Sequence, residues 1–274
     1  MGCSATRFAS WSLVRELLSV SDVALELVDS RNPIATRSKK LERVAEKLGV
    51  PILVVINKAD LVPRRVAEAW KEWFEEQGLR AVYIAAQRRM GTRVLRRVIK
   101  EVAGRGQITV SVFGVPKVGK STLINILKGR HSARTSPYPG SPGYTTRAQV
   151  YKIGGGIYLI DSPGILPPES GGVEAIIRSA PVDSIKNVIQ VALELMKTIL
   201  QHNPYAFLEA YGIESRDLDE ILRELARMRG WLYKRDREPI IEEAAKVIIR
   251  DYLAGKINYF FMPPRPEGSP GRRA

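Results

Sequence analysis

The stretch 114–122, which reads GVPKVGKST, constrains the fold of this chain more than any other feature. It matches the pattern G-x-x-x-x-G-K-S, follows the apolar run 108–113 and precedes a segment with helical periodicity. In such a context glycines let successive backbone N–H groups point at phosphate oxygens, and the start of the helix adds positive potential. A coincidental glycine-rich turn would not need those flanking elements. The stretch therefore predicts a phosphate-binding loop at the edge of an α/β sheet.

Within this loop two side chains have distinct expected roles. Lys120 would place its ammonium against the β- and γ-phosphates of a nucleotide, and Ser121 would offer its hydroxyl to Mg²⁺. The residues expected to contact the phosphates are Gly114, Pro116, Lys117, Val118, Gly119, Lys120, Ser121 and Thr122.

A second loop, Asn57-Lys58-Ala59-Asp60, follows the apolar run 52–56 and reads as a guanine-recognition element. A carboxylate such as Asp60 accepts hydrogen bonds from both donors on the guanine edge, a pair that adenine lacks. We expect Asn57 to brace the loop and the stem of Lys58 to cover the base. The alternative is that Asp60 merely caps the helix that follows. In an ordinary GTPase the base-reading loop comes after the phosphate loop, so the reversed order predicts a circular permutation.

Two further segments complete the expected site. Asp161 follows the apolar run 157–160 and could hold Mg²⁺ through water, while the N–H of Gly164 could reach the γ-phosphate. Between them and the phosphate loop, Thr145 or else Thr146 could close over the metal. An ordinary Pro-Gly turn and two solvent-facing threonines are the alternatives.

The run 81–85 leads into a third loop on the base side. A backbone N–H at Ala85 or Ala86 could donate to the guanine oxygen. This segment carries no signature beyond its position after a strand, so it adds to the site without defining it.

The order of elements predicts the fold class. Apolar, β-branched runs at 23–28, 52–56, 81–85 and 108–113 alternate with helical patterns at 38–48, 66–77, 92–102 and 120–127. This alternation predicts an α/β fold with a mostly parallel, doubly wound sheet and helices on both faces. The runs 148–153 and 157–160, joined by three glycines, predict an antiparallel hairpin at one edge.

The character of the sequence changes after residue 168. Helical patterns at 184–201, 218–228 and 242–253, the last stopped by Gly255, predict a small all-α domain. We expect a permuted GTPase domain over 1–168, a flexible joint at 169–172, a helical RNA-binding domain up to 262 and a flexible tail over 263–274.

Charge indicates the class of partner. Lys and Arg number 43 against 29 Asp and Glu, a formal net charge of +14 that favours a polyanion such as nucleic acid. One basic stretch comprises Arg88, Arg89, Arg93, Arg96, Arg97, Lys100 and Arg105. A second comprises Arg223, Arg227, Arg229, Lys234, Arg235 and Arg237, beside Trp231 and Tyr233. Either stretch could instead be a solvated helix face.

Cysteine content and hydropathy exclude further classes of protein. The single Cys3 excludes an intramolecular disulfide and a zinc site built on cysteines. No apolar run approaches the ~18 residues that span a bilayer, and the N-terminus lacks secretory-signal features. We expect a cytoplasmic monomer without membrane contact.

Taken together, these motifs resemble the circularly permuted GTPases of the YlqF/YawG group, which assist assembly of the large ribosomal subunit. The resemblance covers about residues 10–264, including the segment 22–33 before the guanine loop. It implies GTP or GDP with Mg²⁺ as ligands, and ribosomal RNA within a large-subunit precursor as partner. Catalysis would be positional, with Lys120, Thr145 and Gly164 holding the γ-phosphate. The alternative hypotheses are a GTP-dependent RNA-binding module without significant hydrolysis and an ATP-driven RNA remodeller.

Two residues qualify the resemblance. Ile165 stands where many GTPases place a water-orienting glutamine, which implies slow intrinsic hydrolysis. Lys117 stands where the family usually carries an asparagine that helps bind an activating potassium ion. Its ammonium could occupy the position of that monovalent cation, or the side chain could project into solvent.

Overall fold

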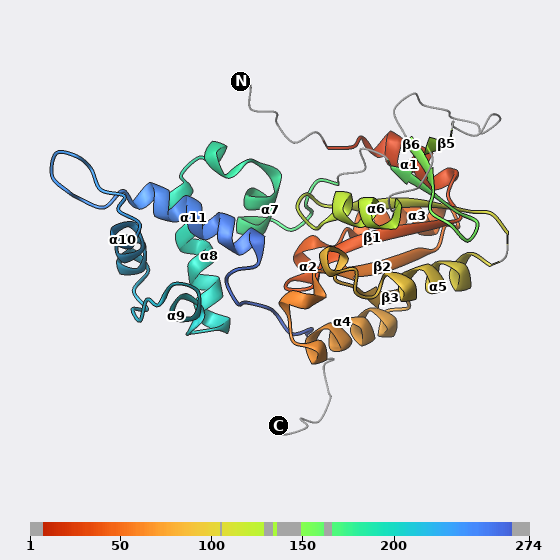
Figure 1. The fold of residues 1–274 in the computed structure, drawn as a ribbon. Coiled ribbons are helices and arrows are strands. Elements are labelled where there is room, and N and C mark those ends of the chain that lie inside the picture. Colours follow the sequence, from red (N-terminus) through yellow and green to blue (C-terminus); the bar gives the residue numbers. More distant parts are fainter. Residues whose placement is uncertain (1–7, 105, 129–133, 136–148, 162–165, 265–274) are drawn as a thin grey trace.

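The protein was examined as a computed structural model that describes residues 8–104, 106–128, 134–135, 149–161 and 166–264. In this part of the chain a mixed β-sheet flanked by helices is followed by a purely helical region, and the two lie side by side (Figure 1). We call residues 8–166 the sheet region and residues 172–259 the helical region.

Seven described strands form one sheet with the order β3-β2-β1-β4-β7-β6-β5. Their bounds are β1 Val23–Asp29, β2 Ile52–Asn57, β3 Arg80–Tyr83, β4 Ile108–Gly114, β5 Arg134–Thr135, β6 Gln149–Lys152 and β7 Ile157–Asp161. The first four strands and β7 pair in parallel, whereas β6 pairs antiparallel with both β7 and β5. The predicted doubly wound sheet with a hairpin at one edge is confirmed.

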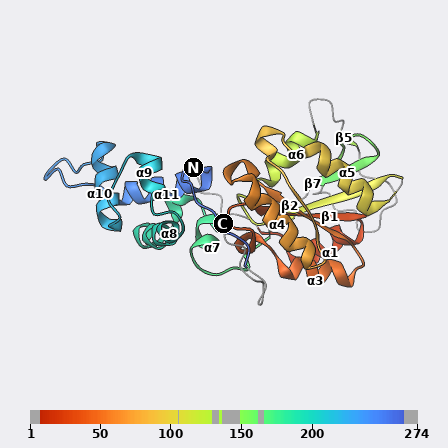
Figure 2. The same cartoon turned by 90° about the horizontal axis from the view of Figure 1, so that it is seen from below.

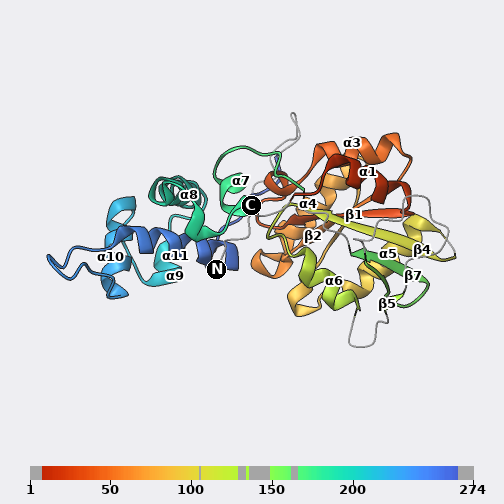
Figure 3. The ribbon, with the colours of Figure 1, turned by 90° about the horizontal axis from the view of Figure 1, so that it is seen from above.

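Helices cover both faces of the sheet. Their bounds are α1 Trp11–Ser19, α2 Pro33–Thr36, α3 Lys39–Lys47, α4 Arg64–Glu76, α5 Thr92–Ala103 and α6 Lys120–Lys128. Helices α1 and α3 lie on one face, and α5 and α6 lie on the other (Figures 2 and 3). Chain direction explains this division, because right-handed crossovers that run in opposite directions along a parallel sheet place their helices on opposite faces.

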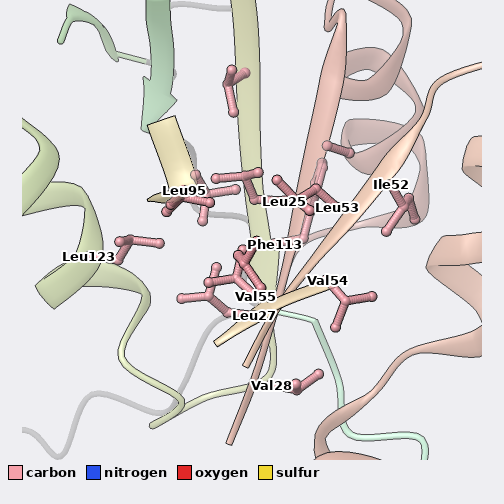
Figure 4. Packing of buried hydrophobic residues seen from close by; sticks show 14 of the residues in the cluster. Leu25, Leu27, Val28, Ile52, Leu53, Val54, Val55, Leu95, Phe113 and Leu123 are labelled. Atoms are coloured by element: carbon pink, nitrogen blue, oxygen red, sulfur yellow. The ribbon is translucent and has the colours of Figure 1, made fainter. Parts of the chain in front are cut away.

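The sheet core is built from the central strands. Every residue of β1 and of β2 is buried, which matches their near-continuous apolar sequences. Leu25, Leu27 and Val55 pack with Phe113 of β4, while Leu95 and Leu123 approach from α5 and α6 (Figure 4). Each such side chain contributes about 1.5–3 kcal/mol by leaving water, and together they fix the strand ends that carry the loops described below.

The helical region has its own apolar core. Its helices are α7 Gly172–Ser179, α8 Val188–His202, α9 Ala206–Tyr211, α10 Leu218–Met228 and α11 Ile241–Ala254. Buried side chains from α8, α10 and α11 meet at its centre, among them Met196, Leu225 and Ile248. Gly255 ends α11 with φ of 81°, as the sequence predicted. No helix of the described residues is long and apolar enough to cross a membrane.

Two local expectations were wrong. Helix α8 begins at Val188 rather than near 184, because residues Val182–Ser184 form a 3₁₀ turn and Asn187 adopts φ of 52°. The stretch 169–172 was expected to be a flexible joint, but its first two residues, Glu169 and Ser170, are anchored to the sheet region. The Glu169 carboxylate accepts hydrogen bonds from the Ser38 hydroxyl and the Lys40 N–H, and Ser170 Oγ donates to the Ala35 carbonyl at 2.7 Å. The domain boundaries proposed from the sequence stay a prediction.

Candidate nucleotide-binding site

The expected loops emerge from one edge of the sheet. Parallel pairing places Asp29 opposite Asn57 and Leu27 opposite Gly114, so β1 and β2 end at the same level and β4 ends two residues earlier at the same edge. Strands β1 and β4 are neighbours whose following connections lead in opposite directions along the sheet. Such a point at the carboxyl ends of parallel strands is where ligands bind in open α/β folds.

The phosphate loop connects β4 to α6. Gly114 is the last residue of β4 and Lys120 the first of α6, so the loop ends at a helix N-terminus. Val115, Pro116 and Val118 are buried, and the Leu166 N–H donates to the Gly114 carbonyl at 3.0 Å. The buried loop residues and the hydrogen bond from Leu166 therefore fix the backbone of the loop, while Ser121 and Thr122 remain exposed.

Asn57 connects the guanine loop to the phosphate loop. Its Nδ2 donates to the Val118 carbonyl at 2.8 Å, and its Oδ1 accepts from the Ala86 N–H at 3.1 Å. A Cβ on Gly119 would lie 2.4 Å from the same Nδ2, and Gly119 has φ of 99°. Only glycine satisfies both conditions. One buried amide thus joins three loops that are far apart in the sequence, including the bracing contact predicted for it.

These loops enclose a pocket. Its lining from the sheet region includes Asn57, Lys58, Asp60, Ala86, Gly119 and Thr122. The carboxylate expected to read guanine therefore lies in the same cavity as the phosphate loop. In this structure Asp60 Oδ2 is 2.9 Å from Arg88 Nε, a pairing that sequence analysis did not anticipate.

The third loop differs from its expected arrangement. The Ala85 N–H donates to the Met90 carbonyl and the Ala86 N–H to Asn57, so both backbone donors have protein partners. Gln87, the next residue of this loop, lines the pocket together with Ala86. In this structure the two N–H groups therefore build the loop, and the role of Ala85 and Ala86 toward the base stays a prediction.

Several expected site residues lie beyond what the structure describes. Thr145, Thr146 and Gly164 fall outside the described residues, as does the side chain of Asp161, the last residue of β7. Their proposed roles stay predictions.

Comparison with known proteins identifies the family. The model for RsgA GTPase matches residues 22–170, and the model for 50S ribosome-binding GTPase matches residues 109–235. The fold resembles GDP-bound YlqF with a TM-score of 0.69 and 25% identity, covering 92% of this chain and 99% of that one. The chain belongs to the circularly permuted ribosome-biogenesis GTPases.

Relatives of this permuted GTPase differ in length. Ribosome biogenesis GTPase A of Bacillus cereus is 30% identical over 89% of this chain and 86% of its own length. An uncharacterized GTP-binding protein of Methanocaldococcus jannaschii and nucleolar GTP-binding protein 2 of Saccharomyces cerevisiae are each 32% identical. They align over 90% and 94% of this chain, which spans 66% and 54% of their lengths.

Lys117 of the permuted GTPase has partners that the sequence did not predict. Its Nζ donates to the carbonyls of Ile177 and Ala180, at 2.5 and 2.6 Å, where α7 ends. Burial and the nearby Arg178 charge lower the pKa of this ammonium. Its ammonium is therefore hydrogen-bonded although the residue is exposed, and its role at the monovalent-cation position stays a prediction. The phosphate loop is tethered to the helical region by a cation at a helix C-terminus, where the helix dipole favours positive charge.

A buried charge cluster beside the guanine loop escaped sequence analysis. Asp29 Oδ2 lies 2.9 Å from Arg31 Nη2, 2.9 Å from Lys58 Nζ and 3.3 Å from Arg178 Nη2. Burial alone would raise the pKa of Asp29, but the three cations hold it well below its ordinary value. Burial also lowers the pKa of Lys58. Because Arg178 belongs to α7, this cluster links the base-reading loop to the helical region.

The two basic stretches of the permuted GTPase have different environments. In the first, Arg88 pairs with Asp60, Arg96 donates to the carbonyls of Ile153 and Leu127, and Arg97 lies 3.5 Å from Glu101. Arg105 lies outside the described residues. All six cations of the second stretch are exposed, and Tyr233 among them is 54% exposed. Trp231 is half-buried and packs against the helical core.

Proposed function

We propose that this chain binds GTP and hydrolyses it slowly, as a switch that assists assembly of the large ribosomal subunit. The observation that carries the proposal is the Asn57 side chain, which holds the guanine loop against the phosphate loop at one pocket. A buried amide with both polar atoms satisfied fixes the relative position of the two loops. Family membership and the printed name of the Bacillus relative support the same function.

Different residues of the pocket would bind the base and the phosphates. Asp60 would accept the two guanine donors, the stem of Lys58 would cover the base, and Lys120 would neutralise the terminal phosphates. Asn57 positions these loops, so that little reorganisation accompanies binding.

The donor set fits a magnesium ion. Hydroxyl and carboxylate oxygens are ligands that Mg²⁺ prefers, and Ser121, Asp161 and Thr145 would supply them. Ser121 lies exposed in the first turn of α6, at the end of the phosphate loop. Mg²⁺, when bound, supplies charge neutralisation at the β- and γ-phosphates.

The RNA-facing surface that we propose is the loop 231–240. It forms a hairpin in which the Tyr233 N–H donates to Glu238 and the Ile240 N–H donates to Trp231. Its tip presents exposed Lys234, Arg235 and Arg237, and it projects from the end of the helical region farthest from the sheet (Figures 1 and 2). Exposed cations beside the exposed ring of Tyr233 suit phosphate contact together with base stacking.

Sedimentation with ribosomal particles tests the proposal. We expect the chain to sediment with large-subunit precursors when a GTP analogue is bound. The proposal places this association in the cytoplasm. Replacing Arg235 and Arg237 with alanine should weaken binding and reduce the dependence on salt by about one counterion per lost phosphate contact. Equal binding in the GTP-analogue and GDP states would contradict the switch.

A GTP-dependent RNA-binding module without significant hydrolysis is the second candidate. The apolar Ile165 favours it, because no water-orienting glutamine occupies that position. A single-turnover assay with and without ribosomal particles distinguishes the two. Release of phosphate that depends on Asp60 and rises with the particles supports the switch, whereas none in either condition supports the module.

A further inference from the structure

The pocket of the proposed guanine site has a wall that comes from the helical region. Leu253 and Ala254, the last two residues of α11, line it together with Asp60 and Leu61. They lie about 190 residues after the guanine loop and belong to no motif of the sequence. We propose that Leu253 and Ala254 contact the bound nucleotide, so that the helical region is part of the nucleotide site and its docking sets nucleotide affinity. This inference rests on the proposed function and names a regulation of the same site.

Steric contact fixes the end of α11 beside the base-reading turn. The 3₁₀ turn η1 Ala59–Leu61 carries Asp60, and a Cβ placed on Gly255 would lie 2.5 Å from Leu61 Cδ1. Gly255 has φ of 81°, so it also provides the left-handed residue that ends the helix. Ala254 itself is exposed, and it therefore faces the pocket without serving the helical core.

Hydrogen bonds hold the same helix end on the sheet region. The Arg31 guanidinium donates to the Tyr252 carbonyl in the last turn of α11, where the helix dipole favours a cation. After the helix, the Phe261 N–H donates to the Arg31 carbonyl at 2.8 Å, and Trp70 Nε1 donates to the Phe261 carbonyl at 2.8 Å. The wall is therefore held in place by residues on both sides of Gly255.

The buried charge cluster couples this docking to the base-reading loop. Lys58, a residue that lines the pocket, pairs with Asp29, and Arg178 of α7 pairs with the same carboxylate. Arg178 in turn pairs with Glu174 at 2.7 Å, and the Tyr252 hydroxyl donates to the same Glu174. Moving the helical region away would remove Arg178 from Asp29 as well as the pocket wall. By thermodynamic linkage, nucleotide binding and docking then favour one another.

The chemistry of the wall predicts what it contributes. Leucine and alanine side chains offer apolar contact and no hydrogen bonds, so they contact guanine and adenine rings equally well. The wall should therefore set the affinity for a nucleotide but not the choice of base, which belongs to Asp60. This separates the inference from a direct role in guanine recognition.

The experiment uses the full chain with a fluorescent GDP analogue and with unlabelled GDP. Ala254→Trp should fill the pocket from the helical side and weaken analogue binding at least tenfold, with the same relative loss for the corresponding ADP analogue. Leu208→Trp, at a 41% exposed position on α9, is the matched control and should bind as the wild type does. Binding by Ala254→Trp within twofold of the wild type would overturn the inference.

Amide hydrogen exchange on the unaltered chain provides the second measurement. Saturating GDP should slow exchange at Gly255 and Lys256, whose N–H groups donate to the carbonyls of Tyr252 and Asp251, as well as in the phosphate loop. Protection of the phosphate loop without any change at 252–256 refutes the wall but leaves the proposed function intact. No protection at either place, with no analogue binding, refutes both.

Discussion

The side-chain amide of Asn57 lies 2.8 Å from the carbonyl oxygen of Val118, and this contact joins loops separated by 61 residues. In the chain the base-reading loop comes first, yet in space the two loops are neighbours because β2, β1 and β4 are consecutive in the sheet. The permutation changes connectivity without moving the loops from the sheet edge. What it adds is a direct path from β7 into the helical region, which begins with α7 at Gly172.

Base choice should depend on Asp60. Replacing Asp60 with alanine removes the only carboxylate among the described residues that line the pocket, so the preference for GDP over ADP should fall by about 10- to 150-fold, the equivalent of ~1.5–3 kcal/mol for a hydrogen bond to a charged group. Competition titrations with both nucleotides measure the ratio. Arg88→Ala, which removes the observed partner of Asp60 but keeps the carboxylate, is the control and should retain the preference. An unchanged ratio of GDP to ADP affinity in Asp60→Ala would mean that residues other than Asp60 recognise the base.

Gly119 should tolerate no side chain. In Gly119→Ala the added Cβ would meet Asn57 Nδ2 at 2.4 Å, so either the phosphate loop or the bracing amide must move, and GDP binding should be lost. The control is Gly230→Ala, which has φ of 69° but open space around the added Cβ. That variant should lose only ~1–2 kcal/mol of unfolding free energy to backbone strain and keep its affinity for GDP. Calorimetric GDP titration and urea unfolding of both variants test the difference, and equal GDP affinity in the two would contradict the crowding argument.

Asp29 should make the free energy of unfolding depend on pH in the acidic range. Because the pKa of Asp29 is lower in the folded chain than its ordinary value of about 3.9, its stabilising contribution is complete above that value and is lost as pH falls toward the folded pKa. Asp29→Asn removes the counter-ion of buried Arg31 and one of the two carboxylates that pair with buried Arg178, and it should cost about 3–5 kcal/mol at neutral pH. Its free energy of unfolding should also fall less steeply between pH 5 and pH 3 than that of the wild type. Glu214→Gln, at an exposed position, serves as the control. If the free energy of unfolding fell equally steeply with decreasing pH in Asp29→Asn and in the wild type, Asp29 would not be the source of the acid dependence.

The sequence predicted the sheet and the motif loops because both have local signatures. Alternating apolar runs located β1 through β4, and glycine and lysine spacing located the phosphate loop before α6. The cluster around Asp29 has no such signature, since Arg178 and Tyr252 reach it from elements 149 and 223 residues further along the chain. The short helices α2 and α9 were missed for a related reason: four and six residues carry too little periodicity to register. The anchoring of Glu169 and Ser170 was not predicted because the composition of the stretch 169–172 gives no hint of Ser38 and Ala35, which hold these two residues.

Lys117 should make hydrolysis independent of the alkali cation. An asparagine at this position could offer a carbonyl oxygen to a potassium ion, whereas the Lys117 side chain has no acceptor and its ammonium donates to the end of α7. GTP hydrolysis by the wild type should therefore differ by less than about twofold, or ~0.4 kcal/mol, between potassium and sodium chloride. Lys117→Asn should become faster in potassium than in sodium, and asparagine suits the left-handed conformation of this residue, which has φ of 66°. Lys117→Met, which removes the charge without supplying an oxygen, is the control and should show no cation preference. A strong potassium requirement in the wild type would mean that a metal cation, and not the α7 tether, completes this loop.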